Sequence, residues 1–370
     1  MTDPRIEKLA QLLVNYCIRV KPGDRVALNS SSAAIPLVNE TLRAIIRAGG
    51  MPYVIWNEES FTEILLKEGN DDQLRHISEP EEIIFRSYDS LIRIGAAVNT
   101  RALSGVDSKR QKMRQTASRE LLELLMKRSA AAEMDWVGTL YPTNAQAQEA
   151  DMSLSEFEAF VYGACYVDRE DPVAEWQKLS KMQQTLVDWL KGRENVRVTG
   201  PNADLTLSIA GRTFINSDGR RNMPSGEIFT GPVEASANGW IRFSYPAIYS
   251  GREVDAVELC FENGRVVEAS AKKNESFLLD TLDTDEGARF LGEFAIGTNK
   301  GINRFSKSIL FDEKIGGTIH LAVGAGYPET GSSNRSAVHW DMICDMRNAG
   351  RIWIDDELFY DSGEFQILNH

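Results

Sequence analysis

The chain has 370 residues, 42% of them hydrophobic and 26% charged, a composition typical of a globular protein long enough for two domains. Its 41 basic and 54 acidic residues give a formal net charge of −13, which argues against a nucleic-acid partner or an anionic membrane surface. No segment approaches the roughly eighteen apolar residues of a membrane span, and we expect no signal peptide. The four cysteines form no Cys-x-x-Cys pair, so we expect a cytoplasmic location.

Segments typical of helices and strands alternate through the first half of the chain. Apolar residues at helical spacing predict a helix over residues 3–20. Strands are predicted at 24–30, 51–56, 88–98 and 134–142, with helices near 33–48 and 108–128 between them. Such alternation favours βαβ units and a mainly parallel sheet. None of the connecting turns carries a nucleotide-binding glycine motif, so no nucleotide is expected here.

The pattern changes after a second helical region. Residues 142–168 are mostly helical, with a capping box at Ser153 and Glu156, and an amphipathic helix follows at 172–191. From residue 196 onward the segments are β-branched and alternating, with a hairpin signal at Asn263-Gly264 and a helix near 275–291. We therefore predict an α/β domain with a mainly parallel sheet over residues 1–185. A β-rich, antiparallel α+β domain carrying a metal site is predicted over residues 186–370.

Two of the four histidines, His320 and His339, lie within residues 311–345. Asp341 follows His339 by two positions, so in a strand both side chains point to the same face. Asp312, Glu313 and Tyr327 lie in the same segment. Imidazole and carboxylate groups are ligands that Zn, Co, Mn and Fe accept. Taken alone, however, a His–Asp pair of purely structural role explains the triplet slightly better than a metal does.

Two earlier acids change that balance. Glu227 follows a Pro-Ser-Gly turn, and Glu293 stands in the centre of the apolar segment LGEFAIG. A carboxylate in an apolar segment is costly unless it is paired, protonated or bound to a cation. For either glutamate by itself, an exposed loop or strand edge is the simpler interpretation. Their combination with the two histidines favours a shared metal site.

Several segments also follow one another in the order of a known family. They are NMPSGEIFT (222–230), LGEFAIGTN (291–299), LFDE (310–313), IHLAVGAGYP (319–328) and the N-x-S-x-x-H-x-D pattern at 334–341, preceded by a similar mid-chain segment at 141–162. In these segments the chain resembles the aminopeptidase T / aminopeptidase S family of metallo-aminopeptidases.

This resemblance implies a homodimer of two-domain subunits that hydrolyses the N-terminal residue of peptides, or acts on another small molecule, at a two-metal centre. The expected cofactors are two divalent ions, Zn, Co or Mn. A water held between two such ions loses a proton near neutral pH and becomes the nucleophile. Glu293 is expected to bridge the metals, and Tyr327 to lie beside them and stabilise the oxyanion. The expected ligands are Glu227, Glu293, Glu313, His320, His339 and Asp341.

The segment FDEKIGGTIH departs from the family pattern. The family usually has asparagine in place of Lys314 and a histidine closer to the acidic pair, which leaves open whether Glu313 is a ligand. The short segment between His320 and His339 leaves room for a different activity. One alternative is a single-Fe(II) ring-cleaving dioxygenase acting on dihydroxypyridines, because His320, His339 and Asp341 form a 2-His-1-carboxylate set. Another is a non-catalytic protein that binds peptides or small molecules.

Overall fold

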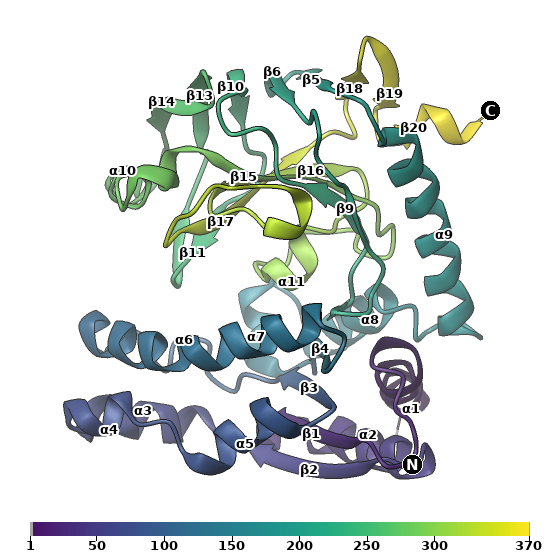
Figure 1. Ribbon diagram of the computed structural model, residues 1–370, viewed down its shortest axis with the longest axis vertical. Coiled ribbons are helices and arrows are strands. Elements are labelled where there is room, and N and C mark those ends of the chain that lie inside the picture. Colours follow the sequence, from purple (N-terminus) through teal and green to yellow (C-terminus); the bar gives the residue numbers. More distant parts are fainter. Residues whose placement is uncertain (1–2, 370) are drawn as a thin grey trace. The chain divides into compact units, whose positions relative to one another are not determined.

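The computed structural model describes residues 3–369, which form two compact units (Figure 1). The first unit comprises Met1–Glu175 and Gly219–Pro224, and the second comprises Trp176–Asp218 and Ser225–His370. The domain boundary predicted between residues 185 and 186 falls inside one long helix, α9 (Pro172–Leu190). That boundary stays a prediction.

A parallel five-stranded sheet forms the centre of the first unit, as the alternating pattern predicts. Its neighbouring strands pair in parallel in the order β2-β1-β3-β4-β8. The last strand has two residues and comes from much later in the chain than the other four. The strands are β1 (Arg25–Ser30), β2 (Met51–Trp56), β3 (Ser90–Gly95), β4 (Asp135–Leu140) and β8 (Asn222–Met223).

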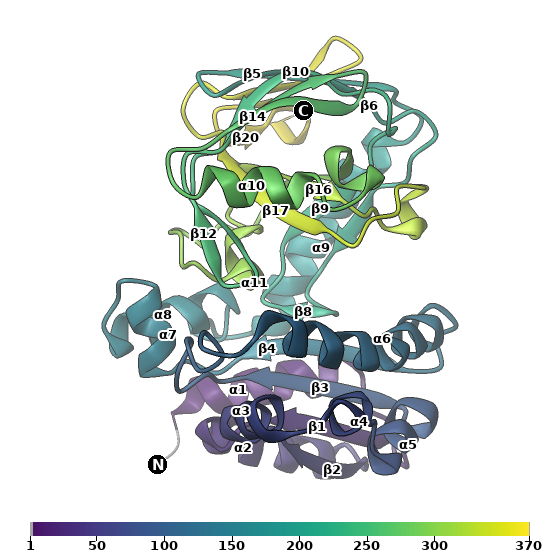
Figure 2. The same cartoon turned by 90° about the vertical axis from the view of Figure 1, so that its left-hand side faces the viewer.

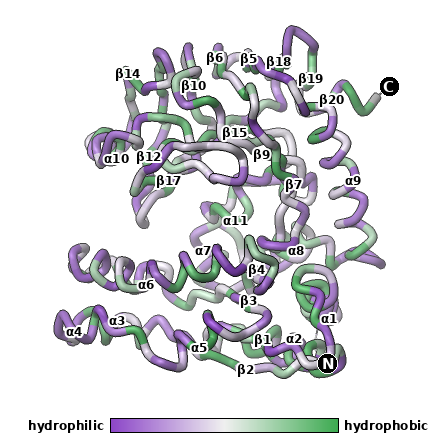
Figure 3. The backbone as a smooth tube through the Cα atoms, viewed as in Figure 1, coloured by the Kyte–Doolittle hydropathy of each residue, from purple (hydrophilic) through white to green (hydrophobic). Residues whose placement is uncertain are grey.

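The helices of this unit include all those predicted and three short ones between residues 59 and 87. Buried Leu121 and Leu125 of α6 pack with Ala27 and Leu91 of the sheet, while the rest of that helix is mainly hydrophilic (Figure 3). The capping box at Ser153 is confirmed at the start of α8. The helices are α1 (Pro4–Gln11), η1 (Leu12–Cys17), η2 (Ser32–Ala34), α2 (Ile35–Arg47), α3 (Glu59–Glu68), α4 (Asp71–Arg75), α5 (Glu79–Ser87), α6 (Ser108–Ala130), α7 (Asn144–Glu149) and α8 (Leu154–Ala164).

Two antiparallel sheets lie one above the other in the second unit (Figure 2). The larger antiparallel sheet has the order β14-β13-β10-β6-β5-β18-β19-β20, and its strands are β5 (Asn195–Gly200), β6 (Ala203–Ser208), β10 (Asn238–Arg242), β13 (Glu258–Glu262), β14 (Arg265–Ser270), β18 (Arg351–Ile354), β19 (Glu357–Asp361) and β20 (Glu364–Phe365). The smaller antiparallel sheet has the order β17-β16-β15-β9-β7, and its strands are β7 (Ile215–Ser217), β9 (Glu227–Thr230), β15 (Leu291–Gly297), β16 (Thr318–Gly324) and β17 (His339–Asp345). Apolar side chains from both sheets form one core. The predicted fold class, α/β followed by antiparallel β, is confirmed.

The connections of the second unit agree in part with the sequence. Asn263 and Gly264 have φ angles of 48° and 84°, so both central residues of the predicted hairpin turn are left-handed as a type I′ turn requires. The predicted helix at 275–291 is shorter, because α10 ends at Leu282 and only a 3-10 turn follows. The remaining elements are α10 (Glu275–Leu282), η3 (Glu286–Arg289), α11 (Ile309–Asp312), η4 (Pro328–Thr330), η5 (Gln366–Asn369), and the paired strands β11 (Ala247–Tyr249) and β12 (Arg252–Val254). Among residues 3–369 we find no helix that is both long and apolar enough to span a membrane.

Candidate metal centre

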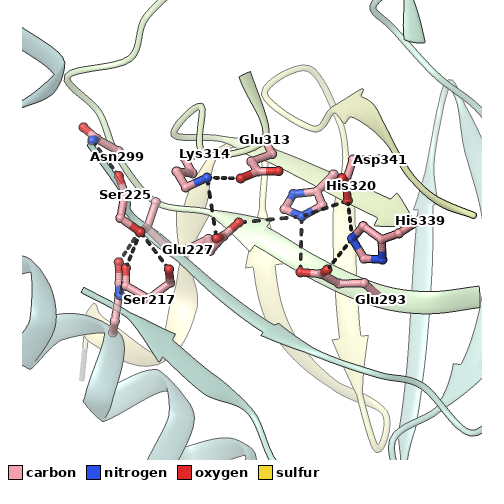
Figure 4. Close-up of polar contacts among 12 residues, drawn as sticks. Ser217, Ser225, Glu227, Glu293, Asn299, Glu313, Lys314, His320, His339 and Asp341 are labelled. Carbon is pink, nitrogen blue, oxygen red and sulfur yellow. Dashed lines mark hydrogen bonds and ion pairs between the residues drawn. The ribbon is translucent and has the colours of Figure 1, made fainter. Parts of the chain in front are cut away.

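The central strands of the smaller antiparallel sheet, β15 and β16, are buried on both faces, and the two faces differ in chemistry. Every residue of β15 and of β16 is buried. Because successive side chains of a strand point to opposite faces, Phe294, Leu321 and Trp340 enter the apolar core. Their neighbours along the chain point the other way; they include Glu293, His320, His339 and Asp341, which Figure 4 shows gathered on one side of the sheet.

The strand register explains why these side chains meet. Glu293 lies opposite Ala322 of β16, and Ala322 lies opposite Asp341 of β17. His320 precedes Ala322 by two residues, and His339 precedes Asp341 by two, so all four polar residues share one face. Ala322 lies between Glu293 and Asp341 across the three strands, and its small side chain leaves space between these two carboxylates.

Glu293 lies between the two histidines. Its Oε1 is 3.5 Å from Nε2 of His320, and its Oε2 is 3.5 Å from Nε2 of His339. His320 Nε2 also lies 3.6 Å from Glu227 Oε2 and 3.9 Å from Asp341 Oδ1. These separations are longer than good hydrogen bonds. The polar atoms therefore surround a space instead of closing on one another.

His339 is oriented for a ligand by a bond on its other side. Its Nδ1 lies 2.7 Å from the carbonyl oxygen of Ala325, which can only accept a hydrogen bond. Nδ1 therefore carries the proton, and Nε2 of the neutral ring keeps a lone pair directed at Glu293 and Asp341. Metal-bound histidines are commonly fixed in this way by a backbone carbonyl.

The residues present fit a divalent cation. Among the side chains that the structure describes, Glu227 Oε2, Asp341 Oδ1 and His320 Nδ1 are buried without a hydrogen-bond partner. Orphaned carboxylate oxygens of this kind are costly unless a cation compensates them. Three groups each place their ligand atoms within 4.8 Å of one another: Glu227, Glu293 and His320; Glu293, His339 and Asp341; Glu313, His320 and Asp341.

The electrostatics of the cluster also fit a cation. Burial raises the pKa of Glu293, and the negative charges of Asp341 and Glu227 raise it further. His320 acts to lower this pKa but does not outweigh them. Burial alone would lower the pKa of His320, but the nearby carboxylates of Glu293, Glu227 and Asp341 outweigh this effect and raise the pKa. The site thus favours positive charge on its histidines and a proton on Glu293, as expected of an acidic cavity suited to a cation.

Tyr327 lies beside His339, at the edge of the cluster. Its ring packs edge-on against His339, with centroids 5.3 Å apart, and against Phe229 at 5.5 Å. The residue is 41% exposed, so its ring is open on one side. Burial of the phenol and the charges of Glu293 and Asp341 raise the pKa of Tyr327, which keeps its hydroxyl a hydrogen-bond donor.

Glu313 belongs to the cluster, whereas Asp312 does not. The Asp312 carboxylate accepts hydrogen bonds from the backbone and hydroxyl of Ser306, at 2.7 and 2.8 Å. Glu313 instead accepts a hydrogen bond from Nζ of Lys314, which is fully buried. The sequence marks Lys314 as a departure from the family but does not reveal its burial. His76 is exposed in the first unit, and His370 lies outside the described residues.

A buried set of carboxylates and imidazoles on one side of a sheet is typical of a metal-binding protein, and comparison with known proteins gives the class of metalloproteases. The family model described as "Thermophilic metalloprotease (M29)" matches residues 2–365. The chain therefore belongs to the M29 metalloprotease family, which confirms the family predicted from the motifs. Membership implies a divalent metal cofactor and confirms that the chain is a metal-dependent hydrolase.

Its relatives carry more specific names. Aminopeptidase 2 of Geobacillus stearothermophilus is 28% identical over 92% of this chain and 92% of its own length. Aminopeptidase AmpS of Bacillus subtilis (strain 168) is 26% identical over 87% of this chain and 84% of its own. The solved structure of wild-type AmpT from Thermus thermophilus superposes with a TM-score of 0.85 at 22% identity, covering 98% of this chain and 99% of that one. This last likeness shows the shared fold.

Proposed function

We propose that this chain is an aminopeptidase that removes N-terminal residues from peptides, using two divalent cations with a water between them. One observation carries the proposal: Glu293 directs its two oxygens at different histidines and is common to two of the three ligand groups. A carboxylate in that position is suited to bridge two cations. The proposed ligands of the two cations are Glu227, Glu293, Glu313, His320, His339 and Asp341.

The chain's own residues supply orientation and charge. When bound, divalent cations polarise a peptide carbonyl and lower the pKa of a water molecule. The carbonyl of Ala325 holds the His339 ring in place, and the sheet fixes Glu293 from both sides. Tyr327 is placed to donate its hydroxyl proton to the oxygen that gains negative charge. The relatives are named aminopeptidases, which favours removal of an N-terminal residue over cleavage within a peptide.

Metal analysis and peptide hydrolysis on the purified protein test this proposal. We expect two Zn, Co or Mn per chain, and release of the first residue from a free peptide but not from the same peptide with an acetylated N-terminus. Activity should vanish with a chelator and return with the metal. His76→Ala is a suitable control, because His76 is exposed and should leave metal content and rate unchanged.

The same preparation addresses the alternatives. One Fe(II) per chain with oxygen uptake on dihydroxypyridines would refute the peptidase and favour the ring-cleaving dioxygenase, to which the relatives described above give no support. Tight peptide binding without turnover in the metal-loaded protein would favour a binding protein. The homodimer and the cytoplasmic location expected from the sequence stay predictions.

A further inference from the structure

A lysine ammonium lies inside the candidate metal centre. Lys314 is 0% exposed, donates a hydrogen bond to Glu313 Oε1, and has its Nζ 3.8 Å from Glu227 Oε1. The other oxygen of Glu227 faces Nε2 of His320 at 3.6 Å. Two of the candidate ligand carboxylates, Glu227 and Glu313, are thus already paired with a positive charge of the chain itself (Figure 4).

The backbone fixes the point at which this lysine enters the site. The N–H of Lys314 donates to the carbonyl of Phe311 at 3.0 Å, and its own carbonyl accepts from the N–H of Asn299 at 3.2 Å. Gly297, which pairs with Glu227, makes the approach possible. A Cβ at Gly297 would lie 2.2 Å from the carbonyl oxygen of Ile315, so any larger residue would push the 314–315 backbone away from β15.

In the described part of the chain, the ammonium of Lys314 forms ion pairs with two of the three ligand groups but not with the third. Its ion pairs within the described chain are with Glu227 and Glu313, which belong to the two groups that contain His320. The group of Glu293, His339 and Asp341 shares no ion pair with it among these residues. A cation bound by Glu227 must therefore compete with Lys314 for the same carboxylate, whereas a cation bound by His339 does not.

We propose that Lys314 competes with one of the two cations and so makes the centre load in two unequal steps. The position at Glu293, His339 and Asp341 fills first and tightly. The position at Glu227 and His320 fills second and weakly, because the cation meets the repulsion of the ammonium and must share its carboxylates. This inference rests on the proposed two-cation site, but it concerns metal affinity and can be tested without any substrate.

Titration of the metal-free protein with Co²⁺, followed by calorimetry and by visible absorbance, tests this order of loading. We expect the wild-type chain to bind one ion tightly and a second at least about tenfold more weakly. Lys314→Met keeps a side chain of similar length without the charge, and should tighten the second step by about tenfold or more while leaving the first within about threefold. Lys300→Met is the matched control, because Lys300 is an exposed lysine paired with Glu364.

The outcomes separate this inference from the proposed function. Two binding steps of equal affinity in the wild-type chain would overturn the inference, even if Lys314→Met failed to fold. A folded Lys314→Met protein whose second step has the wild-type affinity would also overturn it. One detectable ion in the wild type and two in the variant would support it. Two unequal steps in a chain without peptidase activity would leave the inference standing and refute the aminopeptidase instead.

Discussion

Substituting Glu293 by glutamine should abolish the stabilisation of the second unit by metal. Glu293 is 4% exposed and lies between His320 and His339, 3.5 Å from each. Glutamine keeps the shape of the side chain but lacks the charge and the second acceptor oxygen. The variant should therefore keep the fold and lose the group that two ligand sets share.

The expected loss can be estimated by mass action. A cation at about 100 times its dissociation constant adds about 2.7 kcal/mol to the free energy of unfolding. In a unit of about 150–250 residues this raises the melting temperature of the wild-type chain by about 5–10 °C. If glutamine weakens the affinity by about a thousandfold, the same concentration adds only about 0.06 kcal/mol. The metal-dependent shift should then be too small to detect.

The metal-free protein should respond in the opposite direction. Burial, reinforced by Asp341 and Glu227, raises the pKa of Glu293 above its ordinary 4.5. The unfolded chain then ionises more readily than the folded one, so this carboxyl costs no stability below pH 4.5 and costs progressively more as pH rises through the folded pKa. Glutamine removes that cost. We expect the metal-free variant to melt at least as high as the metal-free wild type at pH 7.5.

Thermal unfolding followed by circular dichroism, with chelator and with added Zn²⁺, measures both effects. Glu268→Gln serves as the control, since Glu268 is exposed on β14 of the same unit and should leave both curves unchanged. A Glu293→Gln protein that keeps the full metal-dependent shift would refute the bridging role. A metal-free variant that melts well below the wild type would refute the electrostatic argument.

Two further changes test the surroundings of the site. Tyr327→Phe keeps the ring against His339 and Phe229 but removes the hydroxyl, so kcat should fall by about 100- to 1,000-fold with KM and metal content nearly unchanged; an unaltered kcat would refute its role as a donor. Glu234→Gln tests the anchor of the loop that follows Tyr327. Burial acts to raise the pKa of Glu234, but hydrogen bonds from Ser333 and the charge of Arg212, 2.6 Å away, outweigh it and lower the pKa to about 2. Its carboxylate therefore stabilises the fold above pH 4.5, and this contribution is lost as pH falls toward 2. The variant should be less stable by about 1–3 kcal/mol at pH 7 in urea denaturation, and the difference should shrink in acid; a difference independent of pH would contradict this.

The elements with a clear period were predictable from the sequence. The four strands β1 to β4 are short apolar runs between helices, and the Asn263-Gly264 turn carries its own conformational signal. The elements that the sequence did not reveal are short. The three helices between residues 59 and 87 have ten, five and nine residues, and β8 has only two, so its pairing with β4 depends on contacts remote in the chain.

The candidate site divides in the same way. His339 and Asp341 share a face by strand alternation alone, and the buried acid of β15 signals itself by its apolar neighbours. That Glu293 lies opposite Ala322 is a matter of register, which no local pattern determines. Lys314 was hardest to predict, because a lysine in a loop is ordinarily exposed.

The burial of Lys314 follows from the balance of charge in the site. Three carboxylates of the smaller antiparallel sheet and Glu313, which follows α11, surround two imidazoles, so four ionised carboxylates leave the set negative even when both histidines are protonated. A metal-free chain of this kind would repel itself, and an ammonium beside Glu227 and Glu313 relieves that repulsion. The absence of a side chain at Gly297 lets the backbone next to Lys314 pack against β15, so this glycine also affects how tightly the centre binds cations. The stability of the metal-free protein and the affinity for the second cation are therefore opposed. Lys314→Met should bind the second cation more tightly, but its metal-free form should be less stable than the wild type.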